Sequence, residues 1–377
     1  MAPPTSIHLL DGGLGTTLGD QYACKFTTET PLWSSHLLIS DPGTLSKVQT
    51  AFADAGSDVI LTATYQASYE GFERTKLGSD GEGERGIGER EAGAFMRGAV
   101  RIARGAFGHG KAEEGERIRA KVALSLGAFG ATMIPSQEYT GKYDEERLSV
   151  SGLREWHLKR LRAFTPDAVA GLGNGRGSNS LEGEERRKCW ADVDLVAFET
   201  LPLKEEITAV RSAMGELEAK GVERREFWIG CVFPGEGMYL PDRSSIEDIV
   251  KLMLDKREGL SVPMGVGINC TKVGKLEALV LEFEKEVGAL ILKGEADWPA
   301  LVVYPDGTDG EVYDTTKKEW VKSEAGHHSE MSWDETVFGI VERARNRGLW
   351  KSIIVGGCCK TTPDDISNLR KRIDNAV

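Results

Sequence analysis

The sequence predicts a single α/β domain folded as a (β/α)₈ TIM barrel. Short runs rich in β-branched residues recur eight times, and segments with helical patterns separate them. Strands that alternate with helices are typical of a parallel sheet with helical crossovers, and eight such units favour a closed barrel over an open sheet. The length of 377 residues is also usual for a barrel built as one domain, here 1–377.

The predicted strands follow one another at intervals that leave room for a helix. In order, they cover residues 7–13, 58–65, 121–127, 193–200, 227–233, 264–270, 301–306 and 352–359. Ser40-Asp41-Pro42 predicts the start of a helix over 43–56, and the spacing of Ser245 and Asp248 is that of a capping box before 249–254. Thr362-Pro363 supplies a cap and a proline at the first position of the last helix.

Three polar segments do not fit this repeat. Residues 78–90, 108–116 and 171–185 are rich in glycine and charge, and too polar to contribute to a core. We expect them to be mobile surface insertions. The glycine spacing at 171–177 superficially resembles a nucleotide-binding loop, but it follows no predicted strand, so a linker is the favoured interpretation.

The charge balance excludes several classes of partner. The net charge is −12, whereas a nucleic-acid-binding protein would present a basic face, and an anionic membrane would repel this chain. No run approaches the roughly 20 apolar residues of a membrane span. The N-terminus lacks the basic and apolar regions of a signal peptide, so we expect a cytoplasmic protein, either monomeric or weakly homo-oligomeric.

Glycine and cysteine gather where the predicted strands end. Asp11-Gly12-Gly13 ends the first strand and Gly356-Gly357 precedes Cys358-Cys359 in the last, which predicts a substrate pocket at the carboxyl ends of the strands. Tight turns between strand and helix are the alternative explanation for the glycines. Cys270 ends the sixth strand, and alternate strands of a barrel direct side chains into the same layer. Three thiolates there would make an open zinc site.

Whether the cysteines bind a metal depends on the alternatives for them, on the histidines and on the chemistry of a thiol. The alternative for the cysteines is that they are buried and inert, because a free cysteine packs as a small apolar residue. His327-His328 lies in a polar loop, and the remaining histidines match no metal spacing. A free thiol has a pKa of about 8.5, whereas coordination to Zn²⁺ deprotonates it. A site with three cysteines therefore suits the alkylation of a thiol better than hydrolysis.

Five motifs resemble those of the homocysteine S-methyltransferases, in the same order and over nearly the whole chain. They are Asp11-Gly12-Gly13-Leu14-Gly15-Thr16, Thr62-Ala63-Thr64-Tyr65-Gln66-Ala67-Ser68, Phe198-Glu199-Thr200, Gly267-Ile268-Asn269-Cys270 and Gly356-Gly357-Cys358-Cys359. The resemblance implies a barrel whose zinc ion is held by Cys270, Cys358 and Cys359.

The resemblance also implies how the substrates bind. The backbone of Asp11 and Gly12, together with Glu199, would hold the carboxylate and amine of homocysteine, and Asn269 is counted among the substrate-binding residues. Tyr65 and Trp33 would face the methyl donor, because aromatic rings attract diffuse cations. The alternative for Trp33 is simple packing, and for Glu199 an ion pair with a lysine or arginine of the barrel.

The activity implied is zinc-dependent transfer of a methyl group from a sulfonium donor, S-methylmethionine or S-adenosylmethionine, to homocysteine, giving methionine. The transfer would be direct and in line, with no catalytic residue beyond the zinc-activated substrate thiolate. Residues 128–129, 135–137 and 306–307 depart from the family pattern, which leaves the identity of the donor open. The alternatives are a catalytically silent barrel that binds zinc or thiols, and a metal-free barrel lyase.

Overall fold

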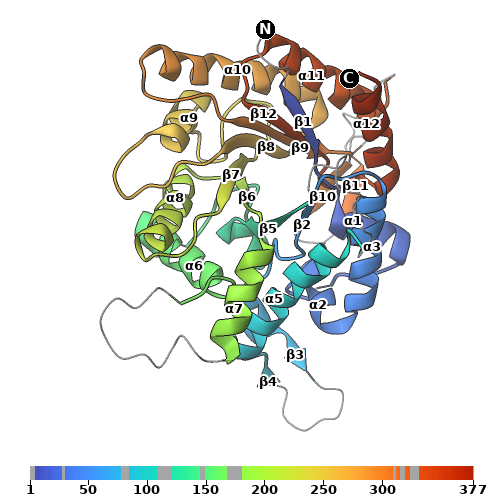
Figure 1. Cartoon of the computed structure of the whole chain (residues 1–377). Coiled ribbons are helices and arrows are strands. Elements are labelled where there is room, and N and C mark those ends of the chain that lie inside the picture. The colour runs from blue at the N-terminus through green and yellow to red at the C-terminus, as the bar shows by residue number, and fades with distance from the viewer. Residues whose placement is uncertain are drawn as a thin grey trace.

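The computed structural model describes residues 5–27, 30–77, 85–108, 120–144, 149–167, 181–308, 311–314, 319–322 and 331–376. Within these ranges, eight parallel strands form the centre of the molecule and helices surround them, with both ends of the chain on the same side (Figure 1). The predicted TIM barrel is confirmed.

The barrel strands follow the order predicted by the sequence. They are β1 (Ser6–Leu9), β2 (Val59–Leu61), β5 (Lys121–Gly127), β6 (Leu195–Leu201), β7 (Glu226–Cys231), β8 (Gly265–Lys272), β9 (Ala300–Asp306) and β12 (Ser352–Val355). Each strand pairs with the next along the chain, and β12 returns to pair with β1. A parallel bridge between Leu10 and Val59 joins β1 to β2, which closes the circle.

The helices lie outside the strands. They are α1 (Leu14–Tyr22), α2 (Leu37–Ser40), α3 (Pro42–Asp54), α4 (Tyr69–Arg74), α5 (Glu89–Gly105), α6 (Val150–Arg162), α7 (Leu181–Asp192), α8 (Lys204–Ala219), α9 (Ile246–Leu254), α10 (Val273–Leu292), α11 (Trp333–Arg347) and α12 (Pro363–Asn375), with two short 3₁₀ helices, η1 (Trp33–His36) and η2 (Phe129–Thr132). The predicted capping box of α9 is present, and α12 begins with a second box that Thr362 makes with Asp365. None of the described helices is both long and apolar enough to cross a bilayer.

The largest differences from prediction lie at the carboxyl ends of the strands. Strands β1, β2 and β12 each stop about four residues before their predicted ends. The residues beyond β12 stay hydrogen-bonded to neighbouring segments. Gly357 donates its amide to the Asp11 carbonyl, and Cys358 donates to the carbonyl of Pro305 in β9. These bonds fix the glycines and cysteines that follow the strand.

Two layers of apolar side chains stabilise the barrel. The larger lies between the strands and the ring of helices. The smaller fills the inside of the barrel and contains Trp228 and Tyr304, both fully buried, with the Trp228 indole donating to the Tyr304 hydroxyl at 3.2 Å. This inner layer fills the barrel below the carboxyl ends of the strands.

The predicted insertions lie partly outside the described residues. Residues 78–84, 109–116 and 171–180 are not described. Within the first insertion, β4 (Arg85–Gly86) pairs with β3 (Lys76–Leu77), and α5 begins at Glu89. Residues 181–185 form the beginning of α7, a helix that the sequence analysis did not expect. A second hairpin, β10 (Glu311–Asp314) and β11 (Glu319–Lys322), follows β9, and His327-His328 lies outside the described residues.

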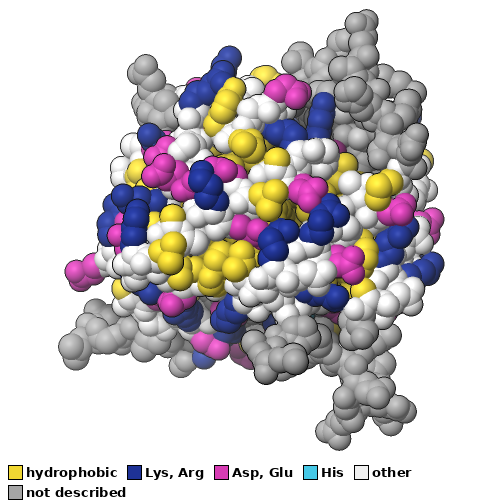
Figure 2. All heavy atoms as spheres, turned by 90° about the horizontal axis from the view of Figure 1, so that it is seen from above, with side chains coloured by type: hydrophobic (Ala, Val, Ile, Leu, Met, Phe, Trp, Pro, Cys, Tyr) yellow, Lys and Arg dark blue, Asp and Glu magenta, His cyan; other side chains and the backbone are white. Residues whose placement is uncertain are grey.

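Charges of both signs are mixed on the surface. On the face drawn in Figure 2, Lys and Arg side chains stand among Asp and Glu side chains, with apolar side chains scattered between them. Leu292, at the end of α10, is the most exposed of the large apolar side chains that the structure describes, at 91%.

Candidate active site

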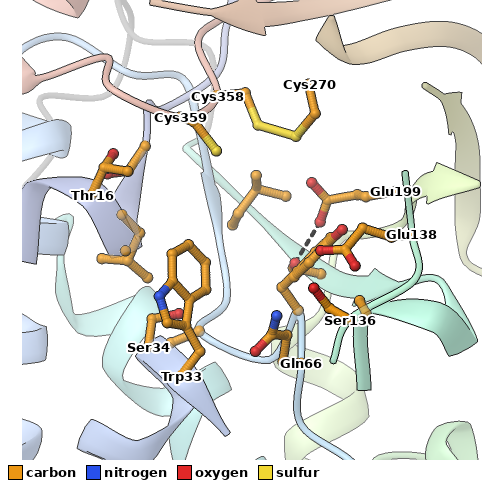
Figure 3. Close-up of a pocket in the computed structure, with 18 of the residues that line it drawn as sticks. Thr16, Trp33, Ser34, Gln66, Ser136, Glu138, Glu199, Cys270, Cys358 and Cys359 are labelled. Carbon is orange, nitrogen blue, oxygen red and sulfur yellow. Dashed lines mark hydrogen bonds between the residues drawn. A yellow bond between two sulfur atoms is a disulfide. The ribbon is translucent and has the colours of Figure 1, made fainter. Parts of the chain in front are cut away.

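Three cysteine side chains meet at the carboxyl ends of the barrel strands. The sulfur atoms of Cys270, Cys358 and Cys359 all lie within 4.8 Å of one another, although 88 residues separate the first two (Figure 3). Cys270 and Cys358 are joined as a disulfide, and Cys359 is a free thiol. The convergence that was expected from strand spacing is therefore present, with two of the three sulfurs oxidised.

Irregular backbone directs these sulfurs to one point. Cys270 lies at a β-bulge of β8 with a φ of +46°, a region that non-glycine residues rarely adopt. Cys358 and Cys359 follow the Gly356-Gly357 pair, beyond the end of β12, so both escape the alternation of a regular strand. At Gly13 the chain passes so close to the Cys358 carbonyl that a side chain would collide with it. Strained backbone of this kind gathers at functional sites.

The cysteine cluster fits a tetrahedral metal once it is reduced. A Zn–S bond of about 2.3 Å in tetrahedral geometry puts thiolates roughly 3.8 Å apart, within the spacing found here. Burial above all, together with the nearby carboxyls of Asp306 and Glu138, raises the pKa of the Cys359 thiol to about 12. This thiol would stay protonated without a cation beside it, so the cluster suits a metal that displaces the proton.

A cavity of about 280 Å³ opens beside the cysteines. Its lining includes all three cysteines and three buried carboxyl groups, those of Asp11, Glu138 and Glu199. No lysine, arginine or histidine is among the described residues that line it. The cavity is therefore an acidic, partly apolar chamber, and its electrostatics favour ligands that carry positive charge.

Glu199 ends a strand inside this cavity, as predicted. It is 4% exposed, and Ser125 of β5 donates a short hydrogen bond to one of its oxygens (Figure 3). Burial raises the pKa of Glu199 to about 7, against hydrogen bonds from Ser125 and Tyr304 that lower it. Among the described residues, no lysine or arginine forms an ion pair with Glu199. The ion pair considered as an alternative is therefore not found there.

Asp11 and Gly12 line the same cavity from the end of β1. One carboxylate oxygen of Asp11 accepts the Leu61 amide at 2.9 Å, while the other, Oδ1, has no hydrogen-bond partner among the described residues. Burial raises the pKa of Asp11 well above its usual value, and the charge of Glu199 raises it further. The carboxyl of Asp11, just beyond β1, and that of Glu199, in β6, are therefore close enough for the charge of one to affect the other.

Tyr65 and Trp33, the two aromatic residues expected near a donor, also line the cavity. The buried Arg160 of α6 donates to the Tyr65 carbonyl at 3.0 Å and to the Gly127 carbonyl at 2.7 Å, which fixes the loop after β2. Burial, and then the charge of Glu138, raise the pKa of Tyr65 well above its usual value. Trp33 lies across the pocket from Glu138 and Glu199 (Figure 3).

Asn269 is not among the residues that line the cavity. Its side chain accepts the Thr200 amide at 2.9 Å and donates to the Thr200 hydroxyl at 2.7 Å. It also donates to the Cys270 sulfur at 3.4 Å. Thr200 has a φ of +60°, so Asn269 holds two strained strand ends together. Its position behind the cysteine indicates a supporting role rather than direct contact with a substrate.

Sequence reasoning assigned no role to Glu138. Glu138 lies on the segment after η2, where six of the seven residues 133–139 line the cavity. Gly130 lets this segment fold back, because a side chain there would collide with the backbone of Gln137 and Glu138. The departure from the family pattern at 135–137 was the nearest signal in the sequence, since the segment belongs to no strand or helix.

Comparison with known proteins agrees with this geometry. The sequence model of a family described as homocysteine S-methyltransferase matches residues 8–373. A homocysteine S-methyltransferase 2 of Arabidopsis thaliana is 27% identical, covering 97% of this chain and 93% of that protein. A selenocysteine Se-methyltransferase of Brassica oleracea var. italica is 28% identical, covering 97% and 88%.

The fold has a close relative among solved structures. The metallated form of the homocysteine methyltransferase MmuM from Escherichia coli superposes with a TM-score of 0.67 at 24% identity, covering 97% of this chain and 96% of that one. At this identity the likeness concerns the fold. The match of the family model over nearly the whole sequence decides the assignment, and the chain belongs to the homocysteine S-methyltransferase family.

Proposed function

We propose that this protein is a zinc-dependent enzyme that transfers a methyl group from a sulfonium donor to the thiol of homocysteine, giving methionine. The observation that carries the proposal is the juxtaposition of three cysteine sulfurs with a cavity whose charged lining residues are all acidic. Three thiolates provide an open zinc site, and an acidic chamber favours a cationic donor. Membership of the family supports the same reaction.

Cys270, Cys358 and Cys359 would hold the zinc ion after reduction of the disulfide. The bound metal would supply a substrate thiol already in its nucleophilic, deprotonated form at neutral pH. The proposal therefore includes a reducing compartment such as the cytoplasm, where thiols are kept reduced.

Homocysteine has an ammonium and a carboxylate group that the chain must recognise. Glu199 and Asp11 face the cavity together, and the unpartnered Oδ1 of Asp11 is available to accept a hydrogen bond from the ammonium group. The first residues of α1, Leu14, Gly15 and Thr16, line the same region, and a helix N-terminus favours a carboxylate. These contacts would orient the sulfur towards the donor without forming a covalent intermediate.

The donor would approach from the side of Tyr65 and Trp33. Aromatic faces stabilise sulfonium cations, by up to about 2 kcal/mol when water is excluded. The cavity volume of about 280 Å³ is at the small end of ligand pockets, roughly 300–1,000 Å³. This size favours S-methylmethionine over S-adenosylmethionine, which carries an additional adenosine.

The direct test is product analysis with the reduced, zinc-loaded protein. Homocysteine is supplied with S-methylmethionine, S-adenosylmethionine or betaine in separate reactions, and methionine formation is followed. We expect rapid turnover with S-methylmethionine, loss of activity on chelation and recovery on adding zinc. Metal-bound protein that forms no methionine from any of these donors would favour the silent thiol-binding barrel instead.

A further inference from the structure

Glu138 is a buried carboxylate with half of its hydrogen-bonding capacity unused. The side chain is 5% exposed, and Ser136 and the Glu138 amide are its hydrogen-bond donors. Its Oε2 atom has no hydrogen-bond partner within the part of the chain that the structure describes. Burying such an oxygen is costly unless something donates to it, so an ionised Glu138 requires a partner that the protein itself does not provide.

A cation with N–H groups is the partner that best suits a buried, ionised carboxylate. No basic side chain is present among the described residues that line this cavity. Glu199, in contrast, has hydroxyl donors from Ser125 and Tyr304. It also lies close enough to Asp11 for its charge to raise the pKa of Asp11. Figure 3 shows Glu138 and Glu199 entering the pocket from the same wall as two separate side chains.

Direct, in-line transfer requires both substrates in the cavity at once. Homocysteine has one ammonium group, and the Asp11 and Glu199 pair accounts for it. We therefore assign the third carboxylate, Glu138, to the second ligand, the methyl donor. A sulfonium sulfur has no hydrogen to donate, so it cannot satisfy Oε2. Pairing the reacting sulfonium with a carboxylate would also stabilise the ground state, because the positive charge disappears as the methyl group leaves.

We propose that Glu138 binds the α-ammonium group of the methyl donor, and that the enzyme thereby selects donors that are amino acids as well as sulfonium ions. This inference rests on the proposed function. Glu138 then acts at a distance from the transferred methyl group and determines donor specificity by a charge-assisted hydrogen bond. The short segment 133–139, rather than the barrel strands, carries the selection.

The experiment compares two donors that differ only in the amino group, S-methylmethionine and its deamino analogue 4-(dimethylsulfonio)butanoate. In the zinc-loaded wild-type enzyme, the analogue should have a kcat/KM lower by roughly ten- to a hundredfold, because Glu138 loses its partner. In Glu138→Gln, S-methylmethionine should weaken by a similar factor, while the analogue changes much less. The KM for homocysteine and the zinc content should stay near the wild-type values.

Glu199→Gln is the matched control, a second buried carboxylate in the same cavity. It should keep the full preference for S-methylmethionine over the deamino donor while losing affinity for homocysteine. If the enzyme uses S-adenosylmethionine as donor, the comparison is made between S-adenosylmethionine and its deamino analogue.

Two results would overturn the inference while methyl transfer itself is observed: a wild-type enzyme that uses both donors equally well, or a Glu138→Gln enzyme that keeps the wild-type preference. The first comparison needs no variant, so it decides the question even if Glu138→Gln does not fold. The absence of methyl transfer from every sulfonium donor would instead refute the proposed function on which the inference rests.

Discussion

The residues that line the cavity come from two kinds of segment. One group lies in or just beyond the barrel strands and contains Asp11, Glu199 and the cysteines. The other group comes from connecting segments, among them 133–139 and the 3₁₀ helix that contains Trp33. In the first group Glu199 has hydroxyl donors from β5 and β9, whereas Glu138 in the second group keeps an oxygen that has no partner among the described residues.

This difference separates two tasks. Residues in or next to the strands of a closed barrel have fixed positions, as metal ligands and an acceptor site require. Loops can change without disturbing the barrel, so they suit the recognition of a donor. Two of the three departures from the family pattern, 128–129 and 135–137, fall on or beside the second group, and the third, 306–307, lies at the end of β9, while the cysteines and Glu199 follow the pattern. The acceptor half and the donor half should therefore respond differently to substitution.

The largest effect is expected at the cysteines. Cys359→Ala leaves at most two sulfur ligands, so zinc binding should be lost and methyl transfer should fall by more than about a hundredfold. Metal content and turnover are measured on reduced protein. Cys24→Ala, a free cysteine outside the cluster, is the control and should retain both. Zinc retained at full occupancy in Cys359→Ala would show that this cysteine is not a ligand.

The next effect should appear in acceptor recognition. In Glu199→Gln, homocysteine should lose roughly ten- to a hundredfold in kcat/KM, since a charge-assisted hydrogen bond is removed. The analogue 4-mercaptobutyrate, which lacks the ammonium group, should change much less. Competition between the two thiols measures this discrimination. An undiminished preference for homocysteine would mean that Glu199 does not recognise the amine.

Tyr65→Ala probes the loop after β2 and should affect the donor alone. Removing the aromatic face should lower kcat/KM for the sulfonium by between about threefold and thirtyfold, with zinc content and homocysteine affinity nearly unchanged. Saturation curves for each substrate separate the two effects. If homocysteine binding suffers equally, Tyr65 also contributes to the acceptor site, and its assignment to the donor site is wrong.

The smallest effect is a dependence on pH. Burial raises the pKa of Glu199 to about 7, so below that pH the carboxyl is largely protonated and cannot pair with an ammonium group. The affinity for the product methionine should therefore increase severalfold from about pH 6 to pH 8, with a proton released on binding near pH 6. Titration calorimetry measures both quantities.

Asp11 faces the same ligand, and burial raises its pKa well above its usual value too. Glu199→Gln should weaken the pH dependence. Glu138→Gln should remove the part that remains, since burial raises the pKa of Glu138 to about 7 as well and methionine is also the demethylated donor. A flat profile in the wild-type protein would show that Glu199 is already ionised at pH 6.

The sequence predicted what depends on local pattern. Alternating β-branched runs and helical segments placed all eight strands, and the spacing of Ser245 with Asp248 predicted a capping box that is present. Motif order placed the cysteines and Glu199 at strand ends. These predictions succeeded because strand propensity, helix capping and hydrophobic periodicity are properties of neighbouring residues.

Contacts between distant segments decided the rest. β12 ends early, and the residues that follow it bond to distant segments, as Gly357 does with Asp11. Asn269, counted from its motif as a substrate-binding residue, bonds to Thr200 and Cys270, an arrangement that exists where β6 and β8 carry bulges. The sequence shows Glu138 only as a glutamate in an irregular segment. Folding buries it against the cavity and leaves one of its oxygens without a donor among the described residues. Burial and unmet hydrogen bonds are set by what surrounds a residue in space, and only the tertiary structure supplies that information.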